Sequence, residues 1–433
     1  MSSIAASVKT INVALCGAGI VGGGVCQIIK ERQDIFAKLG IQFNIKSILV
    51  RNVSKKRDFD VPEGANLTSN LQEIFADESI DLIVEVMGGL GAAKKVVFGG
   101  LEAKKSVVTA NKALISYHLD EIEKLVEKNS SGGARFAFEA AVGGGIPVIK
   151  SLQRDVIAAD EVLQVSGILN GTTNYMLTKM DQTGCSYEAA LKEAQDLGFA
   201  EADPTADVEG HDARSKISLL CRLTLGVWIK DESISCTGIS TLTADDFEYA
   251  KILKSKIKLL GVCKSVNDGT GAEIFVSPVI VPLSNTIASV NGATNIVEVR
   301  SKYLGTTYYV GAGAGRFPTA TSIVSDMLEI SMKKSPKPFP LKNNLTHQTD
   351  YPGKFYIRIN IRDATGIIRT VGQICEENGV SIYAVLQIPI LDKQNVPFVI
   401  TTDETLASKV KTVVDSLEKQ SWCLKRPLAL PFL

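Results

Sequence analysis

The sequence predicts an α/β fold with three parts: a doubly wound parallel sheet of the Rossmann type, an α+β substrate domain, and a ferredoxin-like βαββαβ module. Apolar strands and helical segments alternate in residues 1–149, as βαβ units do. Strand-like and helical segments then mix irregularly, which indicates an antiparallel or mixed sheet. The final residues, 354–433, read strand, helix, strand, strand, helix, strand.

Length and composition indicate a folded multidomain protein that binds small molecules. The 433 residues are too many for one hydrophobic core, and 45% are hydrophobic while 22% are charged. Lys plus Arg equals Asp plus Glu, at 47 each, so no global field favours nucleic acid or an anionic membrane.

Cysteine and histidine usage excludes several chemistries. The 8 cysteines form no C-x-x-C pair and the 3 histidines form no H-x-x-x-H pair, which argues against structural zinc, a disulfide framework and a histidine triad. The start, MSSIAASVKT, lacks the apolar core of a signal peptide, and no apolar run approaches the roughly 18 residues of a membrane span. A cytoplasmic location is therefore expected.

The first strand leads into a glycine-rich turn and a helix, in the segment INVALCGAGIVGGGVCQIIKE. Gly17, Gly19 and Gly22 have G-x-G-x-x-G spacing in this strand–turn–helix context. Backbone N–H groups and the helix dipole can then bind a pyrophosphate. The alternative is a tight strand-to-helix turn that binds no nucleotide.

The second strand, 43–50, favours NADP over NAD. It ends at Arg51, with more basic residues up to Arg57, whereas NAD binders place an acidic side chain here for the ribose 2′-OH. A solvated basic turn is the alternative. Three further strands are expected at 82–86, 106–109 and 136–140, with a helix around 94–104. Asn111 and Lys112 follow the strand 106–109, at the sheet edge where ligands bind.

The middle of the chain is expected to form the substrate domain, 150–311, which would also provide dimer contacts. Strands are expected at 162–169, 273–281, 288–291, 295–300 and 308–311, and helices at 186–197, 212–225 and 244–260. Residues at about 312–333 are expected to return to the first domain as a helix. The proline-rich segment 334–353 is expected to be a linker.

The C-terminal module, 354–433, has strands expected at 355–361, 382–388 and 396–401, with a last strand beginning at 422–424. Helices are expected at 367–377, closed by Asn378 and Gly379, and at 406–417. Such modules often serve assembly or small-ligand sensing.

The stretch 200–220, AEADPTADVEGHDARSKISLL, carries a dense group of acids ahead of Lys216: Glu201, Asp203, Asp207, Glu209 and Asp212. Mutual repulsion disfavours such crowding unless the acids hold a cation or tune a neighbouring acid or base. The alternative is a solvated loop entering a helix, with Asp203 as N-cap and Pro204 at the first helical position.

At these residues the chain resembles the homoserine dehydrogenase family, in its longer form with a C-terminal ACT domain. The most specific matches lie in order at Ala194, Gly198, Asp203, Pro204, Asp207, Val208, Gly210, Asp212 and Lys216. Supporting matches are Gly17 to Gly22, TANKALIS at 109–116 and GILNGTTNY at 167–175.

The resemblance implies reversible, NAD(P)-dependent hydride transfer between L-homoserine and L-aspartate 4-semialdehyde, in threonine, methionine and isoleucine biosynthesis. It assigns substrate binding to Glu201 and Asp207, with Gly171 and Thr172 in a substrate-side loop. Lys216 is the expected proton donor or acceptor, with Asp212 beside the reacting oxygen. Lys112 is a second acid–base candidate, and we expect it to orient rather than transfer the proton.

The resemblance also implies ligand sites. Cofactor binding is expected at Gly17, Ala18, Gly19, Ile20, Val21, Gly22, Arg51, Thr109, Asn111 and Lys112. A monovalent cation, Na⁺ or K⁺, is expected at Glu139, Val142, Gly144 and Ile146, and the alternative is a glycine loop that binds no ion. Threonine or another amino acid is the expected effector of the ACT domain, and the protein is expected to be a homodimer or homotetramer.

Two positions depart from the family pattern. Phe199 stands where tyrosine is usual, and Asp363-Ala364-Thr365-Gly366 replaces an Asp-x-Pro-Gly turn. Two other functions are compatible with parts of the sequence. One is a non-catalytic regulator that senses NADP and amino acids; the other is a different semialdehyde oxidoreductase, which would need a cysteine nucleophile such as Cys185 or Cys221.

Overall fold

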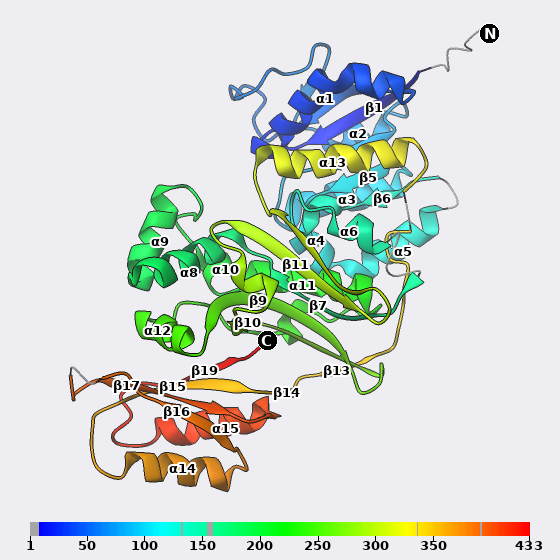
Figure 1. The fold of residues 1–433 in the computed structure, drawn as a ribbon. Coiled ribbons are helices and arrows are strands. Elements are labelled where there is room, and N and C mark those ends of the chain that lie inside the picture. Colours follow the sequence, from blue (N-terminus) through cyan, green and yellow to red (C-terminus); the bar gives the residue numbers. More distant parts are fainter. Residues whose placement is uncertain (1–7, 131–132, 154–158, 336, 390–391) are drawn as a thin grey trace. The chain divides into compact units, whose positions relative to one another are not determined.

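The computed structural model describes residues 8–130, 133–153, 159–335, 337–389 and 392–433 (Figure 1). The N-terminal stretch considered above for a targeting signal, 1–7, lies outside them. The chain divides into two compact units. The first contains residues 1–165, 215–231 and 297–344, and the second contains residues 166–214, 232–296 and 345–433.

The first unit contains the predicted parallel sheet. Its strands are β1 (Lys9–Cys16), β2 (Ile41–Leu49), β3 (Asn66–Thr68), β4 (Leu82–Glu85), β5 (Ser106–Thr109) and β6 (Phe136–Ala137). They lie in the order β3-β2-β1-β4-β5-β6, and every pairing is parallel. This is the strand order of a doubly wound dinucleotide-binding sheet, so the predicted Rossmann fold is confirmed.

Helix α1 (Ile20–Lys38) packs against α13 (Arg316–Ser331) beside this sheet (Figure 1). A Cβ added at Gly24 would lie 2.9 Å from the Arg316 carbonyl oxygen and 3.0 Å from the Ala320 Cβ, so the close approach needs glycine. Ala320, Ile323 and Met327 of α13 are buried in the same core as β1. The segment 312–333 lies in the first unit, which also takes in 150–165, 215–231 and 297–311, so the compact units do not follow the expected bounds of the substrate domain, 150–311.

The remaining α-helices that the structure describes are short to medium in length. They are α2 (Leu71–Ala76), α3 (Gly91–Glu102), α4 (Lys112–Tyr117), α5 (Leu119–Ser130), α6 (Val148–Ser151), α8 (Gly171–Thr183), α9 (Tyr187–Asp196), α10 (Thr205–Val208), α11 (His211–Thr224), α12 (Ala244–Ile252), α14 (Ile367–Glu377) and α15 (Ala407–Glu418). Within the described part of the chain, none combines the length and apolar character needed to cross a membrane.

A second sheet has the order β12-β11-β7-β9-β10-β13, and β8 pairs with β10. Its strands are β7 (Val162–Ile168), β8 (Ser235–Cys236), β9 (Ser255–Val266), β10 (Gly271–Pro282), β11 (Thr294–Ser301), β12 (Gly305–Ala312) and β13 (Thr346–Gln348). β9 and β10 form a long antiparallel hairpin, whereas β13 runs parallel to β10, so the sheet is mixed as predicted. The segment expected as a linker thus supplies β13.

Two predicted elements in this region are wrong. The helix expected at 244–260 ends at Ile252, and β9 follows because Lys254 takes a positive φ of 50° that breaks the helix. β9 is buried on both faces, so its sequence lacks the alternation that identifies a strand. The strand expected at 288–291 is instead a 3-10 turn, η4 (Thr286–Ser289), whose first turn is capped by the Asn285 side chain.

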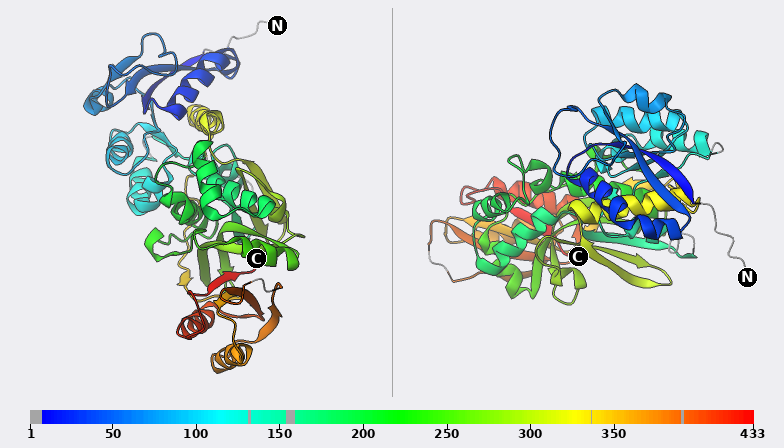
Figure 2. Two further views of the ribbon diagram at one scale, coloured as in Figure 1. Left: turned by 90° about the vertical axis from the view of Figure 1, so that its left-hand side faces the viewer. Right: turned by 90° about the horizontal axis from the view of Figure 1, so that it is seen from above.

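The C-terminal module has the predicted βαββαβ order. Its strands β15 (Phe355–Ile361), β16 (Ile382–Leu386), β17 (Val396–Thr402) and β19 (Leu428–Pro431) lie in the antiparallel order β16-β17-β15-β19. Helices α14 and α15 cover one face (Figure 1). The last strand lies later than the expected 422–424, where only a single bridge joins Cys423 to Ile361. Figure 2 shows the chain end beside β10, where Phe432 bridges Ile280.

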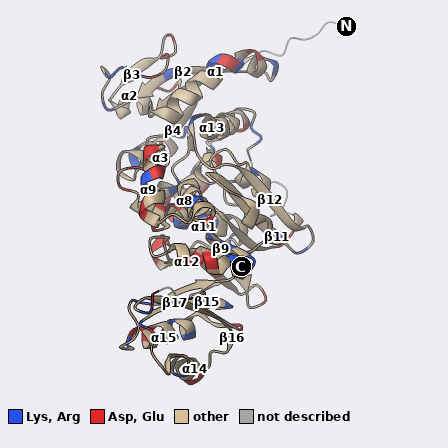
Figure 3. Cartoon of the chain, turned by 60° about the vertical axis from the view of Figure 1, so that its left-hand side comes forward, with Lys and Arg blue, Asp and Glu red and all other residues tan. Residues whose placement is uncertain are grey.

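A buried polar network joins the other face of this module to α12 within the second unit. The Asp246 carboxylate accepts hydrogen bonds from the Tyr356 hydroxyl (2.8 Å) and the Arg358 Nε (2.7 Å), and Arg358 also donates to the Thr241 carbonyl (3.0 Å). Asp246 is 0% exposed and Arg358 is 3% exposed. Removing one partner of such a pair costs about 3–5 kcal/mol. Figure 3 shows the acidic residues of α12.

Candidate active site

The glycine-rich turn has the strand–turn–helix geometry predicted for a pyrophosphate site. β1 ends at Cys16 and α1 begins at Ile20. Gly17 has φ +114°, and a Cβ there would lie 2.7 Å from the Val86 carbonyl oxygen. A Cβ at Gly22 would lie 2.2 Å from the Gly17 carbonyl oxygen. Only glycine fits at these two positions, which lets the backbone turn tightly at the start of the helix.

Glu85, which the sequence analysis did not single out, organises the adjoining loop. It ends β4 and is 0% exposed. Its carboxylate accepts hydrogen bonds from the backbone N–H groups of Met87 (2.7 Å) and Gly88 (3.1 Å), and from the Thr109 hydroxyl (2.5 Å). The signal available in the sequence is one acid inside an apolar strand, because a buried carboxylate requires hydrogen-bond donors.

A cavity of about 590 Å³ opens beside the turn, entirely within the first unit. Its wall includes Gly17, Ala18 and Gly19 on one side and Met87 and Gly88 on another. The end of β2 adds a polar and basic group: Arg51, Asn52, Lys55 and Arg57. The cavity therefore offers backbone donors and positive charge together, and these are the groups that bind a phosphorylated nucleotide.

The end of β5 presents Asn111 and Lys112 in the same unit. The Asn111 carboxamide caps α4 by accepting from the Leu114 N–H (3.1 Å), and it donates to the Gly89 carbonyl (2.7 Å). Lys112 is the first residue of α4 and is partly exposed. The two residues thus lie at a strand end that is fixed to the loop following β4.

The acidic stretch forms a loop, the one-turn helix α10 and the start of α11. The Asp203 carboxylate accepts from the Thr205 N–H (3.1 Å) and hydroxyl (2.6 Å), as in an Asx turn, and the N-cap of α10 is Pro204, so the alternative that placed Asp203 at the N-cap is wrong. Pro204 immediately precedes α10 instead of forming its first residue. Asp212 and Lys216 lie one turn apart on α11, and Lys216 is 8% exposed. Glu201 is exposed on the preceding loop.

Asn170 connects the two aspartates, and the sequence analysis missed it. Its amide nitrogen donates to Asp207 (2.7 Å) and to Asp212 (2.9 Å). Its amide oxygen accepts from the Thr173 N–H (2.9 Å) and so caps α8. One 5%-exposed side chain therefore ties the start of α8 to two acids far along the sequence. Its position beside Gly171 in NGTTNY was the available signal.

Gly171 and Thr172 form the first turn of α8, not a loop. A Cβ at Gly171 would lie 2.8 Å from the Ala293 carbonyl oxygen. A larger residue at this position would therefore displace Ala293, which directly precedes β11. The Thr172 hydroxyl donates to the Phe199 carbonyl (2.6 Å), and the Phe199 ring lies 4.8 Å from the Tyr175 ring. α8 is thus anchored to the loop that carries Glu201.

The group expected to bind a monovalent cation has protein donors on several of its oxygens. The Glu139 carboxylate accepts from the backbone N–H groups of Ile149 (3.0 Å) and Lys150 (2.8 Å), and the Gly144 carbonyl accepts from the Ser322 hydroxyl (2.7 Å). Among the described residues, no cluster of three or more His, Cys, Asp or Glu side chains could hold a metal ion. The cation site stays a prediction, and we derive no step of the reaction through it.

We expect Glu139 to make stability fall as pH rises. Burial and the charge of Asp326 raise the pKa of Glu139 to about 8, and burial raises that of Asp326 to about 6. The folded state then binds more protons than the unfolded state between pH 4.5 and 8, so the free energy of unfolding decreases across that range. Glu139→Gln should remove part of this dependence, on the order of 1–3 kcal/mol at pH 8.

Melting temperatures measured from pH 5 to 8.5 in choline chloride would check this, with Glu102→Gln, an exposed residue on α3, as the control. Equal pH slopes for wild type and Glu139→Gln would contradict it. Repeating the series in NaCl or KCl tests the cation site, because a cation held by ionised Glu139 would flatten the wild-type slope alone.

The parallel sheet, the glycine turn and the adjoining cavity define the first unit as a nucleotide-binding domain of the dinucleotide-binding class. Two family models match the chain: the NAD-binding domain of homoserine dehydrogenase over residues 17–139, and homoserine dehydrogenase over residues 147–328. The homoserine dehydrogenase of Bacillus subtilis is 36% identical over 421 residues, which cover 94% of this chain and 95% of that protein. The chain belongs to the homoserine dehydrogenase family.

Solved structures agree with this assignment. A crystal structure of a homoserine dehydrogenase from Thiobacillus denitrificans matches with a TM-score of 0.90 and 32% identity, covering 99% of each chain. A hyperthermophilic archaeal homoserine dehydrogenase in complex with NADPH matches 76% of this chain and 99% of its own, with a TM-score of 0.62 and 26% identity. The function expected from the sequence, that of a homoserine dehydrogenase, is confirmed.

Proposed function

We propose that the chain interconverts L-homoserine and L-aspartate 4-semialdehyde with NADP as the favoured coenzyme. The observation that supports this proposal most is that the Asn170 side chain donates hydrogen bonds to both Asp207 and Asp212. Asp212 lies one helical turn before Lys216 on α11. The bound coenzyme would accept the hydride in its oxidised form, NADP⁺, and supply it in its reduced form, NADPH. Gly17, Ala18, Gly19, Ile20, Val21, Gly22, Arg51, Thr109, Asn111 and Lys112 are the residues proposed to hold it.

The amino-acid end of the substrate requires acids. Homoserine carries an ammonium and a carboxylate at one end, and the reacting oxygen at the other. We assign the ammonium to Glu201 and Asp207, and the carboxylate to the start of α8 at Gly171 and Thr172. The hydrogen bond from Asn170 fixes the position of the Asp207 carboxylate relative to the start of α8.

The reacting oxygen requires a proton donor or acceptor. We assign that role to Lys216, which is buried on α11. Asp212, one turn earlier on the same helix, is proposed to orient the reacting oxygen of the substrate. During oxidation of homoserine Lys216 takes the hydroxyl proton, and during reduction of the semialdehyde it returns the proton to the new alkoxide oxygen. Lys112 is proposed to orient the substrate oxygen.

The C-terminal module is proposed to be an ACT-type regulatory domain of a homodimeric or homotetrameric enzyme. Its βαββαβ order and β16-β17-β15-β19 sheet support the assignment. Gly366, at φ +85°, forms the N-cap of α14 in place of the usual proline-containing turn. Threonine or another amino acid is the proposed effector.

Initial rates with purified protein test this proposal. Homoserine with NADP should give coenzyme reduction, faster than with NAD, and threonine should change the rate if the module senses it. Absence of homoserine-dependent reduction with either coenzyme would reject the catalytic proposal. Retention of activity after thiol alkylation would further separate it from a cysteine-dependent semialdehyde dehydrogenase.

We expect Arg51→Asp to reverse the coenzyme preference. Arg51 lines the cavity beside the glycine turn, where its guanidinium can pair with a 2′-phosphate, whereas aspartate repels that phosphate and can accept from a ribose 2′-OH. The kcat/KM for NADP should fall about 10–100-fold, a loss of about 1.4–2.7 kcal/mol, while that for NAD is unchanged or rises.

Arg32→Asp, on an exposed position of α1, is the matched control for the change of charge. Equal losses with the two coenzymes in Arg51→Asp would contradict a 2′-phosphate role. Measuring both coenzymes at one ionic strength keeps screening constant between the series.

A further inference from the structure

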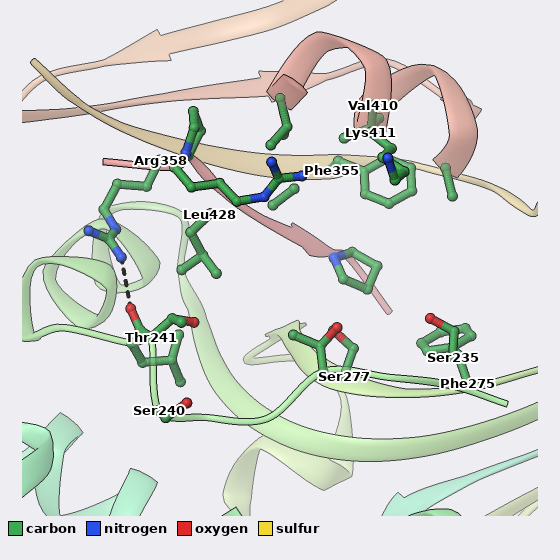
Figure 4. Close-up of a pocket in the computed structure, with 18 of the residues that line it drawn as sticks. Ser235, Ser240, Thr241, Phe275, Ser277, Phe355, Arg358, Val410, Lys411 and Leu428 are labelled. Carbon is green, nitrogen blue, oxygen red and sulfur yellow. Dashed lines mark hydrogen bonds between the residues drawn. The ribbon is translucent and has the colours of Figure 1, made fainter. Parts of the chain in front are cut away.

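A second cavity lies wholly within the second unit and belongs to no step of the proposed reaction. Its volume is about 1060 Å³, in the size range of small-molecule sites. One wall comes from the C-terminal module and the opposite wall from β8, β10 and the loop before α12 (Figure 4). We call it the module cavity.

The module wall of this cavity is cationic and apolar. It carries four basic side chains, Arg358, Lys411, Lys425 and Arg426. Phe355, Val410 and Leu428 form an apolar surface between them (Figure 4). A bound molecule would therefore meet positive charge beside a nonpolar contact surface.

The opposite wall is rich in hydroxyl groups. Ser235, Thr237, Ser240 and Thr241 line it together with Ser277, and the first four are exposed. The Ser277 hydroxyl donates to the carbonyl of Pro278 (2.9 Å). Figure 4 shows Ser235, Ser240 and Thr241 on this wall, across the cavity from Arg358 and Leu428. Hydroxyls can donate to an anion or bond to hydroxyl and amino groups of a ligand.

Most charges around the module cavity are already compensated. Arg358 pairs with Asp246 (2.7 Å), Lys411 with Asp415 (2.7 Å), and Arg426 with Asp415 (2.6 Å) and Glu418. Of the two acids in the wall, Asp350 accepts from the Ser408 N–H (2.8 Å) and hydroxyl (2.6 Å), and hydrogen bonds from its own backbone N–H and from Ser186 lower the pKa of Glu188.

Lys425 is the exception among the basic groups. Across the described ranges it makes no ion pair with a carboxylate within 4 Å. Burial lowers its pKa and the charge of Arg358 lowers it further, while the charges of Asp246 and Asp245 act in the opposite direction. A partly desolvated ammonium without a carboxylate in contact with it favours an anion beside it. Lys425 thus marks the position of uncompensated charge in the cavity wall.

We infer that the module cavity binds a small organic anion, with its carboxylate or phosphate group at Lys425 and its polar carbon chain along the hydroxyl wall. The ligand would also contact Arg358, which holds α12 through Asp246 and the Thr241 carbonyl. Occupancy would therefore change the contact between the C-terminal module and α12. The site is distinct from the turn 363–366, and it does not depend on the proposed reaction.

Calorimetric titration of the full-length protein with citrate and with inorganic phosphate tests the inference, against chloride at matched ionic strength. At least one probe should bind with a dissociation constant of about 1 mM or tighter, equivalent to about −4 kcal/mol. Lys425→Met should weaken it at least fivefold, and Ser240→Glu should abolish it by adding negative charge to an exposed position. Lys419→Met, an exposed lysine of the same module, should bind like wild type.

Which probe binds identifies the anionic group, as carboxylate or phosphate. Hydrogen exchange should show protection of 237–244 and 425–430 on binding. Failure of both probes to exceed chloride, or equal binding by wild type, Lys425→Met and Ser240→Glu, would overturn the inference. The titrations contain neither homoserine nor coenzyme, so failure here is separate from failure of the proposed reaction, and Lys425→Met should retain wild-type homoserine turnover.

Discussion

Replacement of Lys216 by methionine should reduce kcat for homoserine oxidation by about 10²–10⁴-fold, the usual contribution of a positioned acid–base group. Methionine preserves the length and the apolar stem of this 8%-exposed side chain but cannot carry a proton. The KM for homoserine should change only a few-fold, because the ammonium is assigned to Glu201 and Asp207. Steady-state rates in both directions measure the effect.

The matched variant is Lys112→Met, at the first residue of α4. It should lower kcat/KM by less than Lys216→Met, because orientation of the oxygen is lost while the proton carrier remains. Coenzyme binding by fluorescence titration distinguishes the variants that fold and bind from those that do not. Near-normal turnover of Lys216→Met, together with inactivity of Lys112→Met that still binds coenzyme, would exchange the two assigned roles.

The fold of the first unit could be predicted because its signals are local. Each strand is a short apolar run followed by glycine or polar residues, and the G-x-G-x-x-G spacing fixes which turn carries the phosphate site. Glycine conformations bear this out, since Gly17 and Gly22 each face a carbonyl that no Cβ could approach. Each such constraint requires a particular residue type at the position where it acts, so it can be recognised in the sequence.

The β9 strand was missed for the opposite reason. Its segment SKIKLLGVCKSV is buried on both faces between β7 and β10, so its apolar run has no period that separates strand from helix. The break at Lys254 depends on a positive φ, which lysine does not favour. Pairing with β10 determines the strand, and that pairing is not visible in either segment alone.

The sequence analysis could single out the densely spaced acids of the candidate site. It could not single out the neutral side chain that hydrogen-bonds to two of them. Asp207, Asp212 and Lys216 were found because their density and spacing are unusual. Asn170 contacts the two aspartates across 37 and 42 residues, and Glu85 binds backbone groups of its own loop and Thr109. Both depend on tertiary proximity, so composition and spacing do not reveal them.

Asn170→Asp should reduce kcat/KM for homoserine by about 10²–10³-fold. The substitution replaces the amide that donates to Asp207 and Asp212 by a carboxylate, which repels both of them. Aspartate is as good an N-cap as asparagine, so the cap to the Thr173 N–H on α8 is kept and the loss reports on Asp207 and Asp212. The three acids would share protons, which raises their pKa values. The loss should therefore be smaller at pH 6 than at pH 8.

Asn170→Ser provides the charge-neutral comparison, since serine also caps helices but cannot reach both aspartates. It should lose about 10-fold, with little dependence on pH, because it removes two hydrogen bonds without adding charge. Coenzyme binding should be unchanged in both variants, since the residues proposed to hold the coenzyme lie in the first unit. If both variants kept wild-type kcat/KM at every pH, Asn170 would act only as the helix cap, and the bridge between Asp207 and Asp212 would have no part in catalysis.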